Sequence, residues 1–260
     1  MMARGVFPFG QKVGLVRQAD RTPKRIFVLG VYASAVHARW IGPDGKQKVP
    51  ALAVASEPTI FWTGGNQEKL VSKIRIPRTV GELAPAGERF NGPSGRALDD
   101  HFLTPLGRDR PEAWLCDLYP YAMLNPRQLK AIRLKYSPLV ARHGLPRASL
   151  EKAPTKAPAL LRVVEILSEI RRSEAEVLIL LGDRPITWFL TRFQLTYKRL
   201  SDFGTDRSSY GRLHQFPLGD FNIHVLPLVH PRQAARLGAS SAKWGELHDA
   251  WMRDVAPHLL

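Results

Sequence analysis

Short apolar runs of strand length recur along the chain, each bounded by glycine, proline or charged residues. The five runs are Ile26–Leu29, Ala51–Ala55, Ala113–Leu118, Val177–Leu181 and Ile223–Val229. Their length and their boundaries predict five β-strands. The first and fourth runs are continuous rather than alternating, which is typical of strands that are covered on both faces of a sheet.

Helical patterns lie between these strands. Apolar residues recur at helical spacing over Leu160–Ile170, and Pro158 suits the first turn of that helix. Asn125 followed by Pro126 predicts the start of another helix, because the first can cap a helix and the second fits its first position. We expect this second helix to end before Pro138.

A last helix is expected near the C-terminus, where Trp244, Leu247 and Trp251 share one face and Ser240 or Ser241 supplies the cap. Strands that alternate with helices predict an α/β fold. Such a fold has a mostly parallel sheet with helices on both faces.

Two segments without a clear strand or helix pattern contain several prolines, at residues 77–95 and 144–158. We expect a long loop over the first and a connector over the second. Neither requires a domain boundary. The sequence therefore predicts a single domain over residues 1–260, with a core at about 25–255 and an N-terminal extension at 1–24.

The composition is typical of a folded protein in a reducing compartment. Hydrophobic residues make up 44% of the chain, and no apolar run approaches the ~18 residues of a membrane span. Residues 1–12 lack the apolar core of a signal peptide. A single cysteine, Cys116, excludes an internal disulfide and any metal site built on several cysteines. We therefore expect a cytoplasmic monomer with no membrane contact, no metal and no cofactor.

The charge of the chain indicates a polyanionic partner. Lysine and arginine number 38 against 23 acidic residues, which gives a net charge of +15. The excess is uneven, because residues 127–147 hold basic residues and no acidic one. Such tracts favour phosphate contact over a mixed solvated face. DNA is the expected partner, and a merely basic protein is the alternative.

Residues that can carry chemistry follow four of the predicted strands. In open α/β sheets, ligands bind beyond the carboxyl ends of the strands. The segments at those ends are Gly30–His37, Cys116–Tyr121, Gly182–Arg184 and Val229–Gln233. Small residues, a carboxylate and a histidine are thus expected to gather at one edge of the sheet.

These segments, in this order, resemble motifs of the uracil-DNA glycosylase superfamily. Val28–Gly30, with the small and tyrosine residues after it, is similar to the first motif of that family. Ala51–Ser56 occupies the place of the next apolar stretch. Leu103–Gly107 is similar to the family's Leu-Gly turn, and Ala113–Asp117 is similar to its base-reading strand. Leu226–Arg232 resembles the final strand with its His-Pro-Ser loop.

The resemblance implies a three-layer α/β/α domain with a mostly parallel central sheet of four strands. Its members flip a base out of DNA and hydrolyse the N-glycosidic bond, as base-excision repair hydrolases. By this resemblance the catalytic residues are His230, which stabilises the departing base, and Asp117, which reads its edge or orients water. The base pocket is formed by Gly30, Tyr32, Ala33, Ser34 and Val54. DNA is contacted by Arg232, Ser240, Ser241, Lys243, Arg127 and Lys130.

Three positions depart from the family pattern. Tyr32 replaces the water-positioning aspartate, and a phenol with a pKa near ~10 is a poor base. Val54 replaces the phenylalanine that stacks on uracil. Asp117 replaces an asparagine, and an ionised carboxylate only accepts hydrogen bonds. A neutral carboxyl group, or a base with an exocyclic amine, would fit this position better.

Other residues are alternative sources of the missing groups. Glu57, His37 and the Asp99–Asp100 pair can offer an acid or a base, although a surface or capping role explains each at least as well. The aromatic residues that could stack on a base are Trp40, Phe61 and Trp62, and core packing is the commoner fate of such residues.

Two other functions stay open. The same fold could bind nucleic acid without catalysis, since the motif aspartate and phenylalanine are absent. An unrelated α/β hydrolase of small molecules is the third possibility. No Gly-x-Ser-x-Gly elbow supports a triad of Ser34, Asp183 and His230.

Overall fold

The computed structural model describes residues 4–237 and 240–260 and shows an α/β fold. The chain divides into two compact units, each made from three segments. Unit 1 comprises Met1–Val16, Tyr32–Pro93 and Pro120–Thr155. Unit 2 comprises Arg17–Val31, Ser94–Tyr119 and Lys156–Leu260. The single domain expected from the sequence stays a prediction.

Unit 2 is built on a mixed sheet of five strands in the order β5-β1-β6-β8-β7. The strands are β1 (Ile26–Ala33), β5 (Ala113–Ala122), β6 (Val177–Leu181), β7 (His214–Pro217) and β8 (Asn222–Leu228). Strands β1, β6 and β8 are parallel, whereas β7 is antiparallel to β8. The expected four strands were one too few, because β7 is short and half polar and therefore contains no apolar run.

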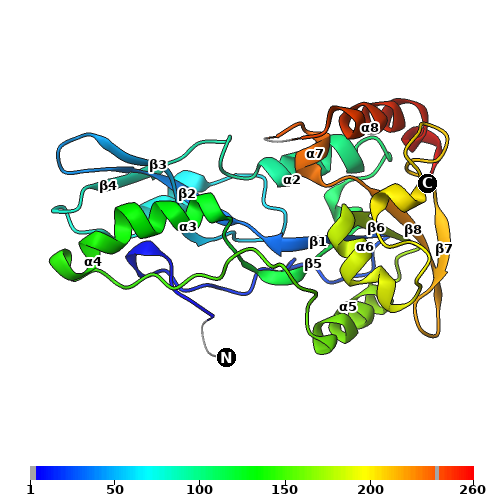
Figure 1. The fold of residues 1–260 in the computed structure, drawn as a ribbon, viewed down its shortest axis with the longest axis horizontal. Helices are drawn as coiled ribbons and strands as arrows, with labels where there is room; N and C mark the ends of the chain where they lie inside the picture. Colours follow the sequence, from blue (N-terminus) through cyan, green and yellow to red (C-terminus); the bar gives the residue numbers. More distant parts are fainter. Residues whose placement is uncertain (1–3, 238–239) are drawn as a thin grey trace. The chain divides into compact units, whose positions relative to one another are not determined.

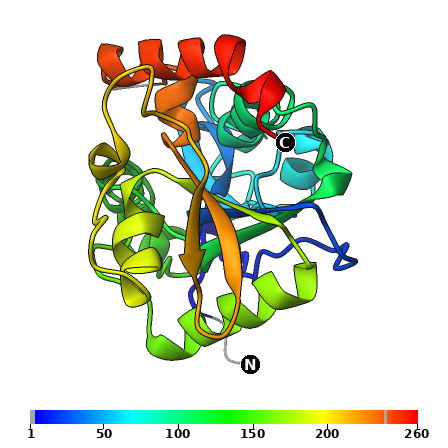
Figure 2. The same ribbon diagram turned by 90° about the vertical axis from the view of Figure 1, so that its right-hand side faces the viewer.

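The helices of unit 2 agree with the helical spacing in the sequence. The long ones are α5 (Leu160–Ser173) and α8 (Ala242–Asp254), which lie on opposite sides of the unit (Figure 2). The short ones are α2 (Pro93–Leu98), α6 (Asp183–Trp188) and α7 (Pro231–Ala234), together with a π-helical turn at Asp99–Leu103 and 3₁₀ turns at Arg110–Glu112, Leu190–Arg192, Leu200–Phe203 and Ala256–His258. Both long helices were predicted from apolar spacing.

Unit 1 contains an antiparallel sheet of three strands in the order β3-β2-β4. The strands are β2 (Ala35–Ile41), β3 (Gln47–Ser56) and β4 (Glu82–Pro85). The loop expected over residues 77–95 thus contains a short edge strand. The connector expected over residues 144–158 is confirmed, because it holds only isolated bridges.

A nearly continuous helical segment lies along this small sheet (Figure 1). It consists of α3 (Pro126–Ala131), a π-helical turn (Ile132–Tyr136) and α4 (Ser137–His143), while α1 (Gln67–Ser72) and a 3₁₀ turn (Pro8–Gly10) lie elsewhere in the unit. The expected stop before Pro138 was wrong. Pro138 falls in the first turn of α4, where its missing N–H is not needed, and the π-helical turn absorbs the change of pitch.

The core of unit 1 includes residues from the segment that was expected to be an extension. Phe7 is fully buried, and the Phe9 N–H donates to the Tyr136 hydroxyl at 2.9 Å. Trp40 and Trp62 also lie in this core, which confirms core packing for both. None of the helices in residues 4–237 and 240–260 has the length and apolar character that crossing a membrane requires.

Candidate functional site

The carboxyl ends of three parallel strands meet at one edge of the unit 2 sheet. The pairing of β1 with β6 ends with Leu29 beside Leu180, and the pairing of β6 with β8 ends with Leu181 beside Leu228. Gly30, Gly182 and His230 therefore lie at this edge, as expected from the sequence.

The segment from Gly30 was expected to follow the first strand, but residues Gly30 to Ala33 belong to that strand. Strand β1 continues through Ala33, and only Ser34 separates it from β2. The prediction was wrong because Val31 and Ala33 remain buried on an extended backbone, so the small residues continue the strand instead of ending it.

Gly182 permits a close approach of two chain segments at this edge. Its backbone has φ +85°, a conformation that side chains disfavour, and its N–H donates to Leu228 O at 2.7 Å. A Cβ atom at Gly182 would lie 3.2 Å from the Cβ atom of His230. The absence of a side chain at Gly182 therefore makes room for His230.

His230 is held as a neutral imidazole with its proton on Nε2. It caps α7, and its Nδ1 accepts a hydrogen bond from the Arg232 backbone N–H at 3.2 Å. Burial, followed by the positive charges of Arg232 and Arg184, lowers the pKa of His230 to about 4. Since Nδ1 accepts, the hydrogen of the neutral ring is on Nε2. His230 thus offers an N–H donor, and the positive charges of Arg232 and Arg184 act on the same position.

A buried chain of hydrogen bonds holds the residue that precedes His230. The Tyr210 hydroxyl accepts from the Val229 N–H at 3.1 Å and lies 2.8 Å from His248 Nδ1. His248 Nε2 lies 2.9 Å from the backbone oxygen of His101, which only accepts. Nε2 therefore donates, and Nδ1 accepts from the Tyr210 hydroxyl. No motif in the sequence predicted these hydrogen bonds. The one indication in the sequence was the position of His248 on the buried face of α8.

Removing the Tyr210 hydroxyl tests this support. We expect Tyr210→Phe to lower the free energy of unfolding by about 1–3 kcal/mol, because it leaves the buried Val229 N–H without a partner. Urea unfolding measures the effect. Tyr197→Phe is the matched control, since the Tyr197 ring stacks on Phe203 in the same unit. Equal effects of the two substitutions would contradict the assigned role.

The carboxyl group of Asp117 is buried without a partner. Its residue is 3% exposed, and no group in the described part of the chain donates a hydrogen bond to its carboxyl oxygens. Burial raises the pKa of Asp117 to about 7, and the charge of Arg162 opposes this shift. Both protonation states are therefore accessible near neutral pH, so the group can either donate or accept.

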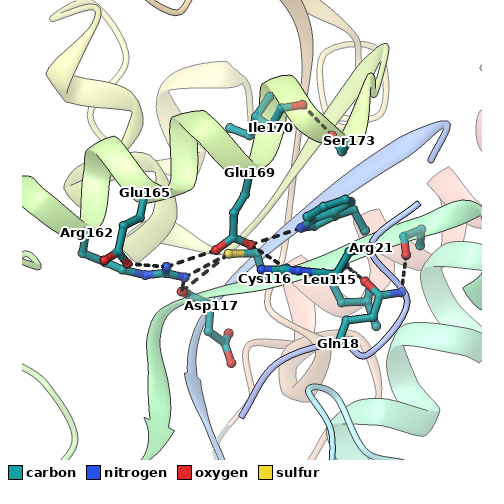
Figure 3. Close-up of polar contacts among 12 residues, drawn as sticks. Gln18, Arg21, Leu115, Cys116, Asp117, Arg162, Glu165, Glu169, Ile170 and Ser173 are labelled. Atoms are coloured by element: carbon teal, nitrogen blue, oxygen red, sulfur yellow. Dashed lines mark hydrogen bonds and ion pairs between the residues drawn. The ribbon is translucent and has the colours of Figure 1, made fainter. Parts of the chain in front are cut away.

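Helix α5 fixes the backbone around Asp117 while leaving its carboxyl group free (Figure 3). Arg162 Nη2 donates to the Asp117 backbone oxygen at 2.7 Å and lies 3.1 Å from Cys116 Sγ. Glu169 pairs with Arg162 at 3.2 Å and accepts from Trp114 Nε1 at 3.1 Å. Burial raises the pKa of the Cys116 thiol, so this cysteine is unreactive. The network holds the middle of β5 in place, and the Asp117 carboxyl group takes no part in it.

The other predicted pocket residues belong to unit 1. Val54 lies in the core with no exposed surface, and Ala33 is nearly as buried, so neither side chain offers a face to a base. That part of the prediction is corrected: the apolar run was long enough to be a core strand. Tyr32 is half-buried in β1. The Ser34 N–H donates to Glu57 Oε2 at 3.3 Å, and Glu57 is buried rather than on the surface.

His37 belongs to a buried polar cluster in unit 1. Its backbone N–H donates to Asn91 Oδ1 at 2.8 Å, and its Nε2 lies 2.7 Å from Gln128 Nε2. Burial lowers the pKa of His37 to about 4. The residue therefore links β2 to α3 as a neutral imidazole.

We expect the protein to lose stability as the pH falls from 6.5 to about 4. His37 and His248 have folded pKa values of about 4 against an ordinary value of 6.5, so the unfolded chain binds their protons first. Stability that is present above pH 6.5 is then lost, by up to about 3 kcal/mol for each histidine. Urea unfolding between pH 6.5 and 4 measures this loss of stability. The Asp117→Asn variant is used because the raised pKa of Asp117 makes stability change with pH in the opposite direction. A flat profile would contradict the buried, neutral state of both histidines.

Two further carboxylates from the sequence have structural partners. Asp99 pairs with Arg110 Nε at 2.6 Å, and Asp183 Oδ1 accepts from the Leu200 N–H at 2.8 Å. Since Asp183 is occupied in this way, the structure gives no support to a hydrolase triad that includes it.

The residues expected to contact DNA are partly engaged. Ser241 caps α8 by accepting from the Trp244 N–H at 3.5 Å, and its own N–H donates to Gln233 Oε1 at 2.8 Å. Ser240 Oγ donates to the Arg232 backbone oxygen at 3.3 Å. The cap expected at Ser240 or Ser241 is therefore Ser241. The exposed basic members of the set are Arg232, Lys243, Arg127 and Lys130.

Comparisons with known proteins yield no relative that assigns these residues a role. No protein-family model matches the sequence, and no curated protein matches it either. Within residues 4–237 and 240–260, no three His, Cys, Asp or Glu side chains form a group that could hold a metal ion.

Proposed function

We propose that this protein is a DNA N-glycosylase that hydrolyses the N-glycosidic bond of a deaminated base, with uracil as the reference substrate. The observation that carries the proposal is the state of His230, a neutral ring with Nε2–H at a strand edge, with the charges of Arg184 and Arg232 nearby. The resemblance of the ordered sequence segments to uracil-DNA glycosylases supports the same assignment.

The reaction needs a group that stabilises a departing anion. The bond between C1′ and the base nitrogen breaks, and its electron pair leaves with the base. A water oxygen then bonds to C1′, and a proton from that water ends on the base. His230 donates a hydrogen bond from Nε2 to a carbonyl oxygen of the base, and the guanidinium groups of Arg184 and Arg232 lower the energy of the anion.

Asp117 reads the edge of the base in its neutral form. A protonated carboxyl group has one O–H donor and one accepting oxygen, the same pattern as an asparagine amide. It can donate to uracil O4 and accept from N3–H. The strand order separates β5 from β8 by two strands, or about 14 Å. On the two strands between them, Gly30 lies within β1 and Gly182 directly follows β6. Neither has a side chain, which supports a base lying across this edge.

A cleavage assay tests the proposal. Labelled strands carrying uracil, hypoxanthine, xanthine or no lesion are incubated with the protein, and abasic sites are then cut with alkali. We expect product from at least one deaminated base and none from the undamaged strand. No abasic product from any substrate, with the protein folded by circular dichroism, would reject it.

Nucleic-acid binding without catalysis is the second candidate. The observation that favours it is the full burial of Val54, which leaves the family's stacking position without a ring or an exposed surface. This alternative predicts binding that weakens steeply with salt and shows no base preference. It also predicts that neither the wild type nor His230→Ala forms an abasic product.

A further inference from the structure

Unit 1 contains a hollow of about 440 Å³ beside the helical segment 126–143. We call this hollow the basic groove. Its walls come from β2, the β2–β3 hairpin, the loop before β4, the π-helical turn and α4. The residues that carry its chemistry are Trp40, Lys48, Leu134, Lys135, Leu139 and Arg142. Its volume lies in the range of sites that hold small organic groups.

The rim of the basic groove is cationic. Lys48, Lys135 and Arg142 line it, and none of its described lining residues is acidic. Lys48 pairs with Asp44 at 2.9 Å, so its charge is partly compensated. In the part of the chain that the structure describes, Lys135 and Arg142 have no acidic partner, and both are exposed. Two uncompensated charges on one rim favour an anion there.

The floor of the basic groove is apolar. Leu134 is 52% exposed, which is unusual for a leucine in a helical segment that packs on a sheet. Leu139 continues this surface, and Trp40 lies buried beneath it with its N–H satisfied by Val80 O at 3.0 Å. Leu134 and Lys135 both lie in the π-helical turn, a feature frequent at functional sites. Apolar floor and cationic rim together match a ligand with a flat uncharged part and an attached anion.

We propose that the basic groove binds an unpaired nucleotide of a DNA strand, with its phosphate on Lys135 and Arg142 and its base on the apolar floor. The identification of the ligand as DNA rests on the proposed function. The charge and shape of the groove are observed independently of that function. A base has a face that packs on apolar side chains, and its phosphate supplies the anion. A base-paired nucleotide cannot enter, because its face is covered by its neighbours in the stack.

Binding of undamaged, labelled oligothymidine, followed by fluorescence anisotropy against salt, tests the groove. We expect Lys135→Gln with Arg142→Gln to weaken binding about tenfold and to reduce the salt slope by about 1.4, since each single-strand phosphate contact contributes about 0.7. The matched control is Lys156→Gln with Arg207→Gln, which removes the same charge from exposed positions of unit 2. We expect the control to change affinity less than about twofold.

A third variant tests the floor without removing a cation. Leu134→Glu replaces an exposed residue, so the fold tolerates it, and it places a negative charge in the groove. We expect a loss at least as large as that of the double variant. The affinity for a blunt duplex should fall less than about twofold in all variants. Equal losses by groove and control variants, an unaffected Leu134→Glu, or equal losses on duplex would each overturn the proposal.

The undamaged strand separates this proposal from the proposed function. If oligothymidine binding depends on the groove but the cleavage assay gives no abasic product, the groove stands and the glycosylase assignment fails. If uracil is excised while the groove variants bind as the wild type does, the groove proposal alone is wrong.

Discussion

Replacing His230 with alanine is expected to lower the rate of base excision by about 10²–10³-fold, while affinity for the same DNA changes less than about twofold. The Nε2–H of this ring meets negative charge that develops only as the bond breaks, so its loss affects the chemical step more than binding. Single-turnover release of the base measures the first quantity, and anisotropy measures the second.

Two further variants separate chemistry from structure. His230→Asn keeps a good cap for α7, because asparagine accepts from backbone N–H groups, but its short amide does not reach the position of Nε2. It should be as inactive as the alanine variant. His224→Ala removes an exposed histidine from β8 and should be fully active. An active His230→Asn enzyme would show that His230 serves only as a cap.

Replacing Asp117 with asparagine is expected to stabilise the protein by about 2–4 kcal/mol near pH 8 and to leave stability unchanged near pH 4. The folded pKa of about 7 lies above the ordinary 3.8, so the native state holds this proton longer than the unfolded chain does. Stability is therefore lost as the pH rises from 3.8 to 7. Asparagine has no proton to lose, so the variant avoids this loss. Urea unfolding at both pH values measures the difference.

The same substitution should preserve excision and change its pH profile. If the neutral carboxyl group reads the base, wild-type activity declines above pH 7 as Asp117 ionises, and Asp117→Asn lacks that decline. Rates of base release across this range give the profile. An inactive but stabilised variant would instead assign Asp117 to the activation of water, and a destabilised one would contradict its unpartnered burial.

The strands were predictable where burial is continuous. All five apolar runs form strands, and β6 matches its run from Val177 to Leu181. Strand β2 was missed because its apolar residues Val36, Ala38 and Trp40 alternate with the polar residues His37 and Arg39, so the segment contains no continuous apolar run. The runs also divide between two sheets. Their division depends on pairing partners far away in the sequence, which local patterns do not contain.

The site was predictable only where chemistry follows a strand directly. His230 and Gly182 lie at the expected edge because parallel strands share a direction. The support from Tyr210 and His248 was not predictable, since both depend on burial by segments distant in the chain. The lack of a hydrogen-bond partner for the Asp117 carboxyl group was not predictable either, because it depends on which distant segments pack around this residue.

The tautomer and the pKa of His230 are the most direct test of the central claim, and nitrogen-15 NMR of labelled histidine measures both. The account predicts a neutral ring with its proton on Nε2 at neutral pH, which titrates only near pH 4. This signal is identified by its loss in His230→Asn. A proton on Nδ1, or a titration near pH 6.5, would contradict the claim that this edge is built to donate a hydrogen bond to an anion.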